Sequence, residues 1–504
     1  MTKRFYLNYV GFLILCSAVL QSGCAPRSSV PTPGVTADGS PVERLRGDLD
    51  RYFSDPAFAS AQWGVEVVSL DRGELLYERN STKLCMPASN NKLLISAAAL
   101  VRLGPEYRFE TGIWRRGKIG EGTLSGDLIV TGTGDPSTAA RFHSGDAFAV
   151  FKDWAARLKE IGIRKIAGSL VGDDRAFESR PLGRGWQWDD LAYGYSAPVT
   201  ALQFNESLVT AEFTAAPEEG GPATLKLVPD TGYLKADCRV LTGPAGTEAS
   251  IDLERMETGE SVVFRGSVPL KGEPFLQKVA VRYPTLYFLQ ALKQTLQSEG
   301  IDMTVCEVNA AAGEQNRSDK ELLWTHKSVA LAEILKPLLK VSQNLYAETM
   351  VRELALATRG EGTFDWGSDI LQETLHSMAI EKGSYQYADG SGLSRLNLIS
   401  PDLLVRIFKF MYRHKYFSQF YDALPVAGVD GTLSDRMKGS KAEGNARAKT
   451  GSLTHVRSLS GYVHTSDGEM VAFAMIANNF LVSSKTAEYA QDSTVERLAA
   501  FTRH

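Results

Sequence analysis

The chain has 504 residues, of which 43% are hydrophobic and 23% are charged, so we expect a globular protein large enough for two to four domains. Its formal net charge of −4 and the lack of any Lys/Arg-rich run argue against a nucleic-acid partner. The seven histidines show neither H-x-x-x-H nor H-E-x-x-H spacing, so the sequence favours neither a metal site nor another cofactor.

The N-terminus has the pattern of an export signal. Lys3 and Arg4 give a basic start, residues 10–20 form an apolar core too short to span a bilayer stably, and residues 21–24 resemble a cleavage region. We therefore predict a signal peptide at residues 1–24 and export to the periplasm or cell envelope. The stretch resembles a bacterial lipoprotein signal, which implies a lipid on Cys24 and a place in a membrane such as the outer membrane. Ordinary cleavage, giving a soluble periplasmic protein, is the alternative.

A flexible tether and a hairpin are expected next. Residues 25–42 are rich in Pro, Ser, Thr and Gly, as is typical of a linker. A helix is predicted near residues 43–53. Residues 62–70 and 74–78 alternate like two strands, and an Asp-Arg-Gly turn at residues 71–73 joins them into a β-hairpin.

The hairpin leads into a short stretch in which a serine and a lysine stand one helical turn apart. Pro87 pre-sets the backbone for a first turn, and residues 93–100 are apolar on nearly every face, which predicts a buried helix. Ser89 and Lys92 then share one face. A serine hydroxyl needs an adjacent base to act as a nucleophile, and a buried neutral lysine can be that base. Alternatively, Ser89 only caps the helix and Lys92 is solvated.

From about residue 106 the pattern changes to short β-rich segments. We predict strands at residues 123–130, 166–172, 208–214, 223–228, 261–268 and 277–282, with one clear helix at 147–159. Residues 106–282 are therefore expected to form an inserted β-rich module of one or two small domains.

Helical periodicity returns after the insertion. Helices are predicted at residues 285–297, 330–339, 345–357, 366–378 and 401–413, followed by strands at 459–465 and 470–478 and a last helix near 486–501. Strands near both chain ends with helices between them indicate an α+β fold, with one sheet assembled from distant segments. We assign residues 43–105 and 283–504 to this domain.

Two further motifs lie in this second part. Ser342 and Asn344 are two residues apart just before a helix, although Ser342 could be an ordinary helix cap. Lys449, Thr450 and Gly451 precede the strand at 459–465 and are typical of an edge strand with a small residue where another group approaches closely. An ordinary exposed strand end is the alternative.

The order S-x-x-K, S-x-N, K-T-G in one exported chain is a far stronger signal than any of its parts. With it, the chain resembles the penicillin-binding proteins of the D-Ala-D-Ala carboxypeptidase type 4 group, the S13 family of serine peptidases, over nearly all of residues 50–500. Further segments that resemble this family are residues 132–136, 172–174, 195–198, 389–395 and 426–433. The resemblance implies a β-lactamase/transpeptidase-like domain, an antiparallel sheet flanked by helices, with domains inserted between the first two motifs.

The resemblance also implies an acyl-transfer mechanism. Ser89 would attack the carbonyl of the penultimate D-Ala, and Lys92, kept neutral by burial and by the cationic Lys449, would take its proton. Ser342, between the two lysines, would relay a proton to the leaving amine. Backbone N–H groups of Ser89 and Ser452 would form the oxyanion hole.

Substrate binding is assigned in the same way. Asn344 would hold the substrate amide, and Lys449 and Thr450, with Gly451 and Ser452 following on the same strand, would bind the end that carries the terminal carboxylate. Arg395 would help to read the far end of the peptide stem. An acid of the inserted module, Asp173 or Asp174, would assist it.

The resulting hypothesis is a serine D-Ala-D-Ala carboxypeptidase and D,D-endopeptidase. It would act on peptidoglycan stem peptides, be acylated by β-lactam antibiotics, and need no cofactor. A serine β-lactamase or esterase of the same fold is the alternative, but no Glu-x-x-x-Asn loop stands between the first two motifs to hydrolyse a penicilloyl ester rapidly. A wall-binding module without activity would be expected to have lost Ser89, Lys92 or Lys449, and all three are present.

Three cysteines, Cys85, Cys238 and Cys306, follow the signal region. Their wide spacing gives no zinc or C-x-x-C pattern, and in an oxidising compartment one pair could form a disulfide. We expect Cys85 to be a packed small residue rather than a reactive thiol, since no histidine is placed locally to activate it.

Overall fold

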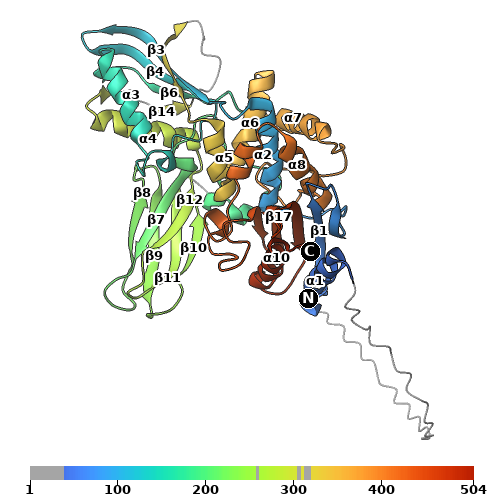
Figure 1. Cartoon of the computed structure of the whole chain (residues 1–504). Coiled ribbons are helices and arrows are strands. Elements are labelled where there is room, and N and C mark those ends of the chain that lie inside the picture. The colour runs from blue at the N-terminus through green and yellow to red at the C-terminus, as the bar shows by residue number, and fades with distance from the viewer. Residues whose placement is uncertain (1–38, 257–259, 304–307, 311–318) are drawn as a thin grey trace, which may run out of the picture. The chain divides into compact units, whose positions relative to one another are not determined.

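The structure is a computed structural model that describes residues 39–256, 260–303, 308–310 and 319–504 (Figure 1). The predicted signal peptide, nearly all of the tether, and Cys306 lie outside the described residues. Residues 41–504 form one compact unit. Within the described ranges no helix combines the length and the apolar character needed to cross a membrane.

A five-stranded antiparallel sheet joins the two ends of this unit. Its order is β16 (Arg447–Leu453), β17 (Val456–His464), β18 (Met470–Asn478), β1 (Gln62–Ser69) and β2 (Leu75–Arg79). Strands β1 and β18 pair along their whole lengths, although about 400 residues separate them. The predicted sheet of distant segments and the predicted hairpin are confirmed.

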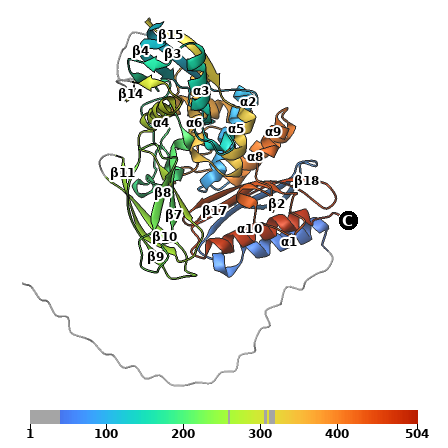
Figure 2. The ribbon, with the colours of Figure 1, turned by 90° about the vertical axis from the view of Figure 1, so that its left-hand side faces the viewer.

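Both faces of this sheet are covered, and its inner strand β18 is buried along its whole length with an almost entirely apolar sequence. Helices α1 (Pro41–Phe53) and α10 (Ser484–Ala499) cover one face, as Figure 2 shows, where Phe473 and Met475 of β18 join their core. Helix α8 (Pro401–Arg413) and the other helices cover the opposite face, where Ala474 and Ile476 join a second core.

The second core is organised around α2 (Lys92–Leu103), which is buried from Lys92 to Leu100. Around it pack α5 (Leu331–Lys340), α6 (Asn344–Arg359), α7 (Phe364–Ser377), α8 and α9 (Phe417–Asp422). All of these helices except the short α9 are predicted by the sequence.

The inserted part lies between α2 and α5 in the chain and contains three sheets. One has the order β13-β5-β4-β3-β15, with β6 and β14 beside it, the second β12-β7-β8, and the third β10-β11-β9. The bounds are β3 (Glu110–Gly120), β4 (Thr123–Thr131), β5 (Lys165–Ile166), β6 (Leu170–Asp173), β7 (Leu208–Thr214), β8 (Thr224–Val228), β9 (Lys235–Gly243), β10 (Ser250–Arg255), β11 (Ser261–Pro269), β12 (Phe275–Ala280), β13 (Asp302–Met303), β14 (Val308–Ala310) and β15 (Glu321–Lys327). Two helices accompany them, α3 (Ala149–Glu160) and α4 (Pro284–Ser298).

The inserted part extends beyond the boundary at residue 283 that we expected. Helix α4 packs against α3 in the core of the inserted part, and β15 pairs with β3 from Glu321↔Arg115 to Lys327↔Glu110. Because periodicity predicts that a helix exists but not which core it joins, the sequence assigned α4 to the wrong neighbour. We propose that the inserted part covers residues 106 to about 327.

Candidate active site

The serine and lysine of the first motif lie at the junction of a 3-10 turn, Ala88–Asn91, and helix α2. Ala88 has φ +48°, a left-handed conformation that an L-residue adopts only when its surroundings enforce it. The turn brings the Lys92 Nζ to 2.9 Å from the Ser89 Oγ. The predicted contact on one helical face is therefore present.

The Lys92 side chain is fully buried. Its Nζ donates hydrogen bonds to Ser89 Oγ, to Asn344 Oδ1 at 2.6 Å and to the Ser391 carbonyl at 2.6 Å. Burial lowers the pKa of Lys92 to about 7, although the carboxylates of Asp389 and Glu348 act in the opposite direction. A neutral amine keeps two N–H groups for Asn344 and Ser391 and turns its lone pair to the Ser89 hydroxyl, so Lys92 can act as a base.

The second lysine, Lys449 on β16, is also fully buried. Its Nζ donates to Ser342 Oγ at 3.0 Å and to the Thr450 carbonyl at 2.8 Å. Burial, and then the charge of Lys92, lower the pKa of Lys449 well below its ordinary value. We expected the charge of Lys449 to help keep Lys92 neutral. Instead, burial alone lowers the pKa of Lys92, and it is the charge of Lys92 that lowers the pKa of Lys449 further.

The second motif links these two lysines to different partners. Ser342, at φ +62°, contacts Lys449, while Asn344 contacts Lys92. The Asn344 Nδ2 also donates to the Tyr195 carbonyl at 2.7 Å. Both ends of the Asn344 amide are thus engaged, and this side chain joins α6 to the inserted part.

Strand β16 forms the edge of the central sheet, as predicted. A Cβ on Gly451 would lie 2.2 Å from Ser458 Oγ and 3.0 Å from the Ser89 nitrogen. Ser458 in turn donates to the Pro87 carbonyl at 2.6 Å. Only glycine lets the nucleophile segment approach the strand so closely. On the residue directly before Gly451, the Thr450 hydroxyl donates a hydrogen bond to Thr432 Oγ1 at 2.7 Å.

Two buried carboxylates hold the loop that carries the Ser391 carbonyl. Asp389 accepts hydrogen bonds from the backbone N–H groups of Gly392 at 2.7 Å and Ser394 at 2.6 Å. Glu348 on α6 accepts from the Ser391 N–H at 2.8 Å, and burial raises its pKa to about 7. The sequence indicated Asp389 only through a family-like segment and did not indicate Glu348.

A cleft of about 350 Å³ opens above Ser89. The residues that line it are Ser89, Gln187, Asp190, Tyr195, Ser342, Asn344, Gly392, Leu393, Arg395, Ser452, Leu453 and Thr454. The cleft therefore brings together most of the predicted site residues, while Lys92 and Lys449 lie buried behind Ser89 and Ser342.

The inserted part supplies one wall of this cleft through Gln187, Asp190 and Tyr195. The Arg395 guanidinium reaches towards it, with Nε 3.5 Å from Gln187 Oε1 and Nη2 donating to the Thr454 carbonyl at 3.1 Å. Tyr195 donates its hydroxyl proton to Asp190 Oδ1 at 2.6 Å. No local pattern in the sequence singled out Gln187 or Asp190.

The expectation that Asp173 or Asp174 faces the substrate is wrong. Asp173 forms an ion pair with Arg175 at 2.7 Å, and Asp174 accepts a hydrogen bond from Thr285. Neither lines the cleft, where the acid from the inserted part is Asp190. Two local partners therefore occupy the carboxylates that the sequence favoured.

Two of the three cysteines that follow the signal region lie within the described residues. Cys85 is buried and Cys238 half-buried, and both are free thiols. Burial raises the pKa of Cys85 to about 11, so this thiol is a packed, unreactive group as predicted. Among the residues that the structure describes, no three His, Cys, Asp or Glu side chains are grouped so as to hold a metal ion.

Comparisons with known proteins agree with the motifs. A family model described as "D-Ala-D-Ala carboxypeptidase 3 (S13) family" matches residues 45–501. The chain is 34% identical over 479 residues to a D-alanyl-D-alanine carboxypeptidase of Actinomadura sp. (strain R39), with 93% of this chain and 87% of the relative covered.

Solved structures give the same result for the fold. The crystal structure of penicillin binding protein 4 (dacB) from Haemophilus influenzae matches with a TM-score of 0.76 and 28% identity, covering 90% of this chain and 97% of that one. A structure of the same protein complexed with a novel β-lactam matches with a TM-score of 0.72 and 26% identity, covering 89% and 97%. The fold expected from the motifs is confirmed.

Proposed function

This chain belongs to the D-Ala-D-Ala carboxypeptidase 3 (S13) family, and from that premise we propose how its residues carry out the reaction. The protein is a serine hydrolase that cleaves the D-Ala-D-Ala bond. The observation that supports our assignment of its nucleophile is the 2.9 Å contact of Ser89 with a buried lysine whose pKa is lowered to about 7. A base with a pKa near the working pH is the kind of group that general-base catalysis needs.

We assign the acylation step to Ser89 and Lys92. The Ser89 Oγ forms a bond to the carbonyl carbon of the penultimate D-Ala, and its proton passes to the Lys92 amine. The carbonyl oxygen becomes negatively charged and receives hydrogen bonds from the backbone N–H groups of Ser89 and Ser452. An oxyanion hole of this kind typically contributes on the order of 10²–10³ in rate.

Release of the terminal D-Ala follows. The carbon–nitrogen bond breaks, and the leaving amine takes a proton through the hydroxyl of Ser342, which Lys449 supports at 3.0 Å. Lys449 and Thr450 bind the carboxylate of the departing D-Ala. Water then attacks the ester carbon, and Ser89 recovers its proton as the free acid leaves.

The substrate that we propose is the stem peptide of peptidoglycan, free or in a cross-link. Its terminal carboxylate points to β16, and Arg395 reads the far end of the stem from the opposite end of the cleft. The half-exposed guanidinium of Arg395 supports this role, since it has no carboxylate partner among the residues described here. β-Lactams would acylate Ser89 as substrate mimics.

We further propose that the chain is exported and carries a lipid on Cys24. The support is the basic start, short apolar core and small residues before Cys24. Mass spectrometry of the mature N-terminus tests this, because lipidation leaves Cys24 as the first residue with an added acyl mass. A mature chain that begins elsewhere, without lipid, would show ordinary cleavage.

Incubation with benzylpenicillin and with a stem pentapeptide tests the proposed mechanism. We expect a single long-lived penicilloyl mass on the peptide that contains Ser89, and release of one D-Ala from the pentapeptide. An adduct on another residue would overturn the assignment of the nucleophile. Rapid loss of the adduct with turnover of penicillin would favour the β-lactamase alternative.

A further inference from the structure

A second hollow, larger than the catalytic cleft, adjoins it inside the inserted part. It measures about 1110 Å³ and is lined by residues 181–182, 188–193, 195, 198, 252–256 and 281–283. Asp190 and Tyr195 line both this hollow and the catalytic cleft, so the two adjoin at these residues. The reaction assigned above does not use this hollow.

Aromatic side chains with exposed faces distinguish the hollow. Trp188 is 85% exposed, and Tyr195 and Tyr283 are about half exposed. Tyr193 stacks on Tyr195 with the ring centroids 5.6 Å apart and the planes 6° from parallel, which fixes the orientation of that ring. An indole left in water contributes little to folding, since the hydrophobic gain needs burial. Its presence points to a ligand with a flat apolar face.

The charges of the hollow indicate what kind of ligand this is. Four carboxylates, those of Asp189, Asp190, Asp252 and Glu254, outnumber the two guanidinium groups of Arg255 and Arg282. Stem peptides carry carboxylates of their own and are repelled by such a surface. A neutral ligand rich in hydroxyl groups can instead donate hydrogen bonds to these carboxylates. Sugar rings combine such hydroxyls with an apolar face.

The position of the hollow agrees with the direction of the substrate. In the proposed function the scissile bond lies at Ser89, and the acyl side of the stem extends along the cleft, whose lining includes Arg395 and Asp190. In peptidoglycan the glycan strand is attached to the amino end of the stem, on the acyl side of the scissile bond, whereas the carboxylate assigned to Arg395 belongs to a free side branch of the stem. A sugar chain would therefore arrive at the hollow beyond Asp190.

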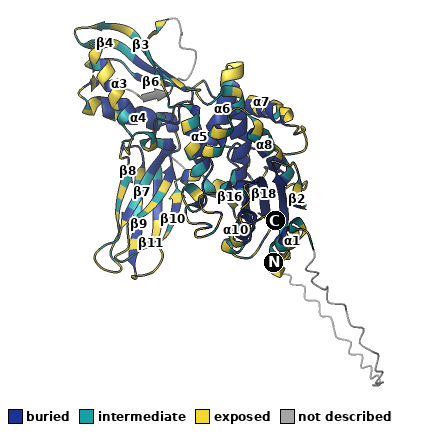
Figure 3. Cartoon of the chain, viewed as in Figure 1, coloured by how far each residue is buried: buried dark blue, intermediate teal, exposed yellow. Residues whose placement is uncertain are grey.

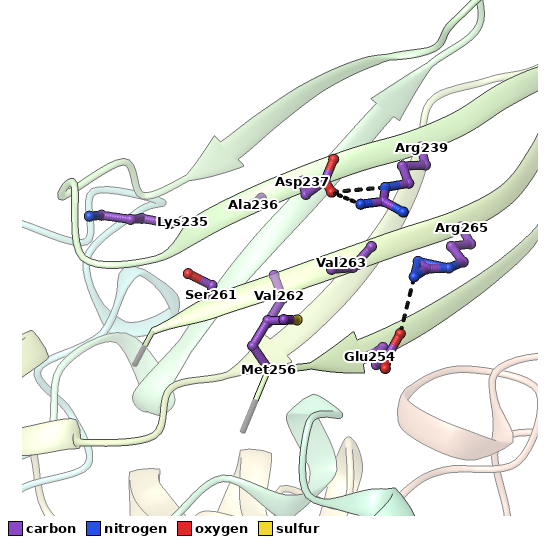
Figure 4. A pocket seen from close by; sticks show the side chains of 10 residues that line it. All are labelled: Lys235, Ala236, Asp237, Arg239, Glu254, Met256, Ser261, Val262, Val263 and Arg265. Atoms are coloured by element: carbon purple, nitrogen blue, oxygen red, sulfur yellow. Dashed lines mark hydrogen bonds and ion pairs between the residues drawn. The ribbon is translucent and has the colours of Figure 1, made fainter. Parts of the chain in front are cut away.

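The surface also continues beyond the hollow in a way that suits a linear polymer. Glu254 lines a third depression, of about 470 Å³, on the face of the sheet β10-β11-β9. Figure 4 shows this face, where Arg265 is paired with Glu254 at 3.4 Å and Arg239 with Asp237 at 2.6 Å. Because these four side chains are paired, this face presents polar atoms but little net charge to a ligand that crosses it.

We propose that the hollow binds the glycan strand of peptidoglycan, with a sugar ring stacked on Trp188 and sugar hydroxyls donating to Asp252 and Glu254. The proposal rests on the proposed function, since it places the glycan by the direction of the stem peptide. It adds a saccharide site to the carboxypeptidase cleft, formed only by the inserted part.

A pair of substrates tests the proposal on the full-length protein. One is a stem pentapeptide, and the other is the same pentapeptide carrying its disaccharide. We expect kcat/KM to be on the order of tenfold higher for the substrate with the disaccharide, an effect the size of one stacking contact. The variant Trp188→Ala should lose this advantage, and Trp188→Phe should keep part of it.

A matched control is Trp366→Ala, which removes a partly exposed tryptophan on α7 that lines neither hollow. It should keep the full advantage of the disaccharide. If Trp188→Ala keeps it too, or if both substrates lose equally in that variant, the proposal is overturned. A third substrate, a cross-linked peptide dimer without sugar, gives a further test. If Trp188→Ala lowers kcat/KM for this dimer as much as for the disaccharide substrate, the proposal is overturned, because the hollow would then hold the second peptide.

Two readouts separate this proposal from the proposed function. Acylation by benzylpenicillin and hydrolysis of the free pentapeptide depend on Ser89 and Lys92 and should not change in Trp188→Ala. If the wild-type protein does not carry out these two reactions, the proposed function fails, whatever the comparison of the two substrates shows. If they are present and Trp188 has no effect, only the glycan site fails.

Discussion

The central sheet and the sheets of the inserted part differ in how far their residues are buried (Figure 3). Every residue of β18 is buried, whereas β8 alternates between exposed and partly buried positions and β10 alternates between exposed positions and partly or fully buried ones. Burial in the first region changes the chemistry of its groups, as the lowered pKa of Lys449 on β16 shows. Exposure in the second leaves polar and aromatic groups free to contact a large substrate.

This contrast suggests that bond cleavage and recognition of the extended substrate can be separated. A β-lactam is small and needs only Ser89 and the buried groups behind it. In our proposal, a stem peptide on its glycan reaches beyond Arg395 to the wall that the inserted part supplies. Comparing the two kinds of substrate in each variant therefore tests the division.

The largest effect is expected for Ser89→Ala, which removes the nucleophile that we propose for both kinds of substrate. Benzylpenicillin should leave no covalent mass, and D-Ala release from pentapeptide should fall to background. The buried contacts of Lys92 with Asn344 and Ser391 remain, so the thermal midpoint should change little. Residual acylation of the variant would place the nucleophile elsewhere.

A smaller but still large loss is expected for Lys92→Ala, which leaves Ser89 without its proposed base. Acylation by benzylpenicillin and turnover of pentapeptide should both fall by about 10² or more, the contribution typical of a general base. Stopped-flow measurement of the acylation rate provides the test. Lys336→Ala, which removes an exposed lysine paired with Glu333, should acylate at the wild-type rate. Wild-type rates in Lys92→Ala would show that another group is the base.

The prediction for Arg395 tests the division itself. Arg395→Ala should lower kcat/KM for pentapeptides with a free carboxylate at the far end, since a charged hydrogen bond contributes about 1.5–3 kcal/mol. Acylation by benzylpenicillin, which lacks that end, should stay nearly unchanged. Arg359→Ala is the control, because Arg359 pairs with Asp369 away from the cleft.

A structural role for Arg395 is the competing explanation. It would brace the segment 389–394, and both reactions would then fall together with stability. The contacts argue against this, because Asp389 is held by backbone N–H groups and Arg395 donates to Thr454 instead. Equal losses of the two activities would nevertheless reject the recognition role.

The sequence predicted the core of the fold because burial leaves a pattern. Apolar periodicity gave the helices α5 to α8, and the apolar runs at both chain ends gave β1 and β18. Strands β9 and β10 were missed because one face of their sheet meets water, so their sequences mix charged and small residues like a loop. The extent of the insertion was missed for a related reason. The sequence of α4 predicts a helix, but it does not show against which core that helix packs.

The same difference explains which site residues could be predicted. Ser89 and Lys92 are fixed by spacing along one turn, and the motifs at Ser342 and Lys449 are equally local. Asp190 becomes part of the site only because the fold brings a distant loop to the cleft. Glu348 acts through the Ser391 N–H, 43 residues away in the chain, so no spacing rule could identify it.

The smallest effect we predict is a pH dependence that both substrates share. Burial lowers the pKa of Lys92 to about 7, and only the neutral amine can take the proton of Ser89. The rate should therefore be constant above pH 8 and fall by about tenfold between pH 8 and pH 6, as the neutral fraction falls. Because protonation of Lys92 lowers the rate with both substrates equally, the ratio of the pentapeptide rate to the benzylpenicillin rate should not depend on pH.

The variant Glu348→Gln gives the sign of this effect a separate test. Where Glu348 is ionised, its charge raises the pKa of Lys92, so replacing it with a neutral amide should move the upper part of the acid limb to lower pH for both substrates. The amide can still accept the Ser391 N–H, which keeps the loop in place. A rate that keeps rising beyond pH 9, towards the ordinary pKa of a lysine, would show that Lys92 is not held neutral by burial. In that case the contrast between a buried catalytic region and an exposed recognition region would no longer account for the activity.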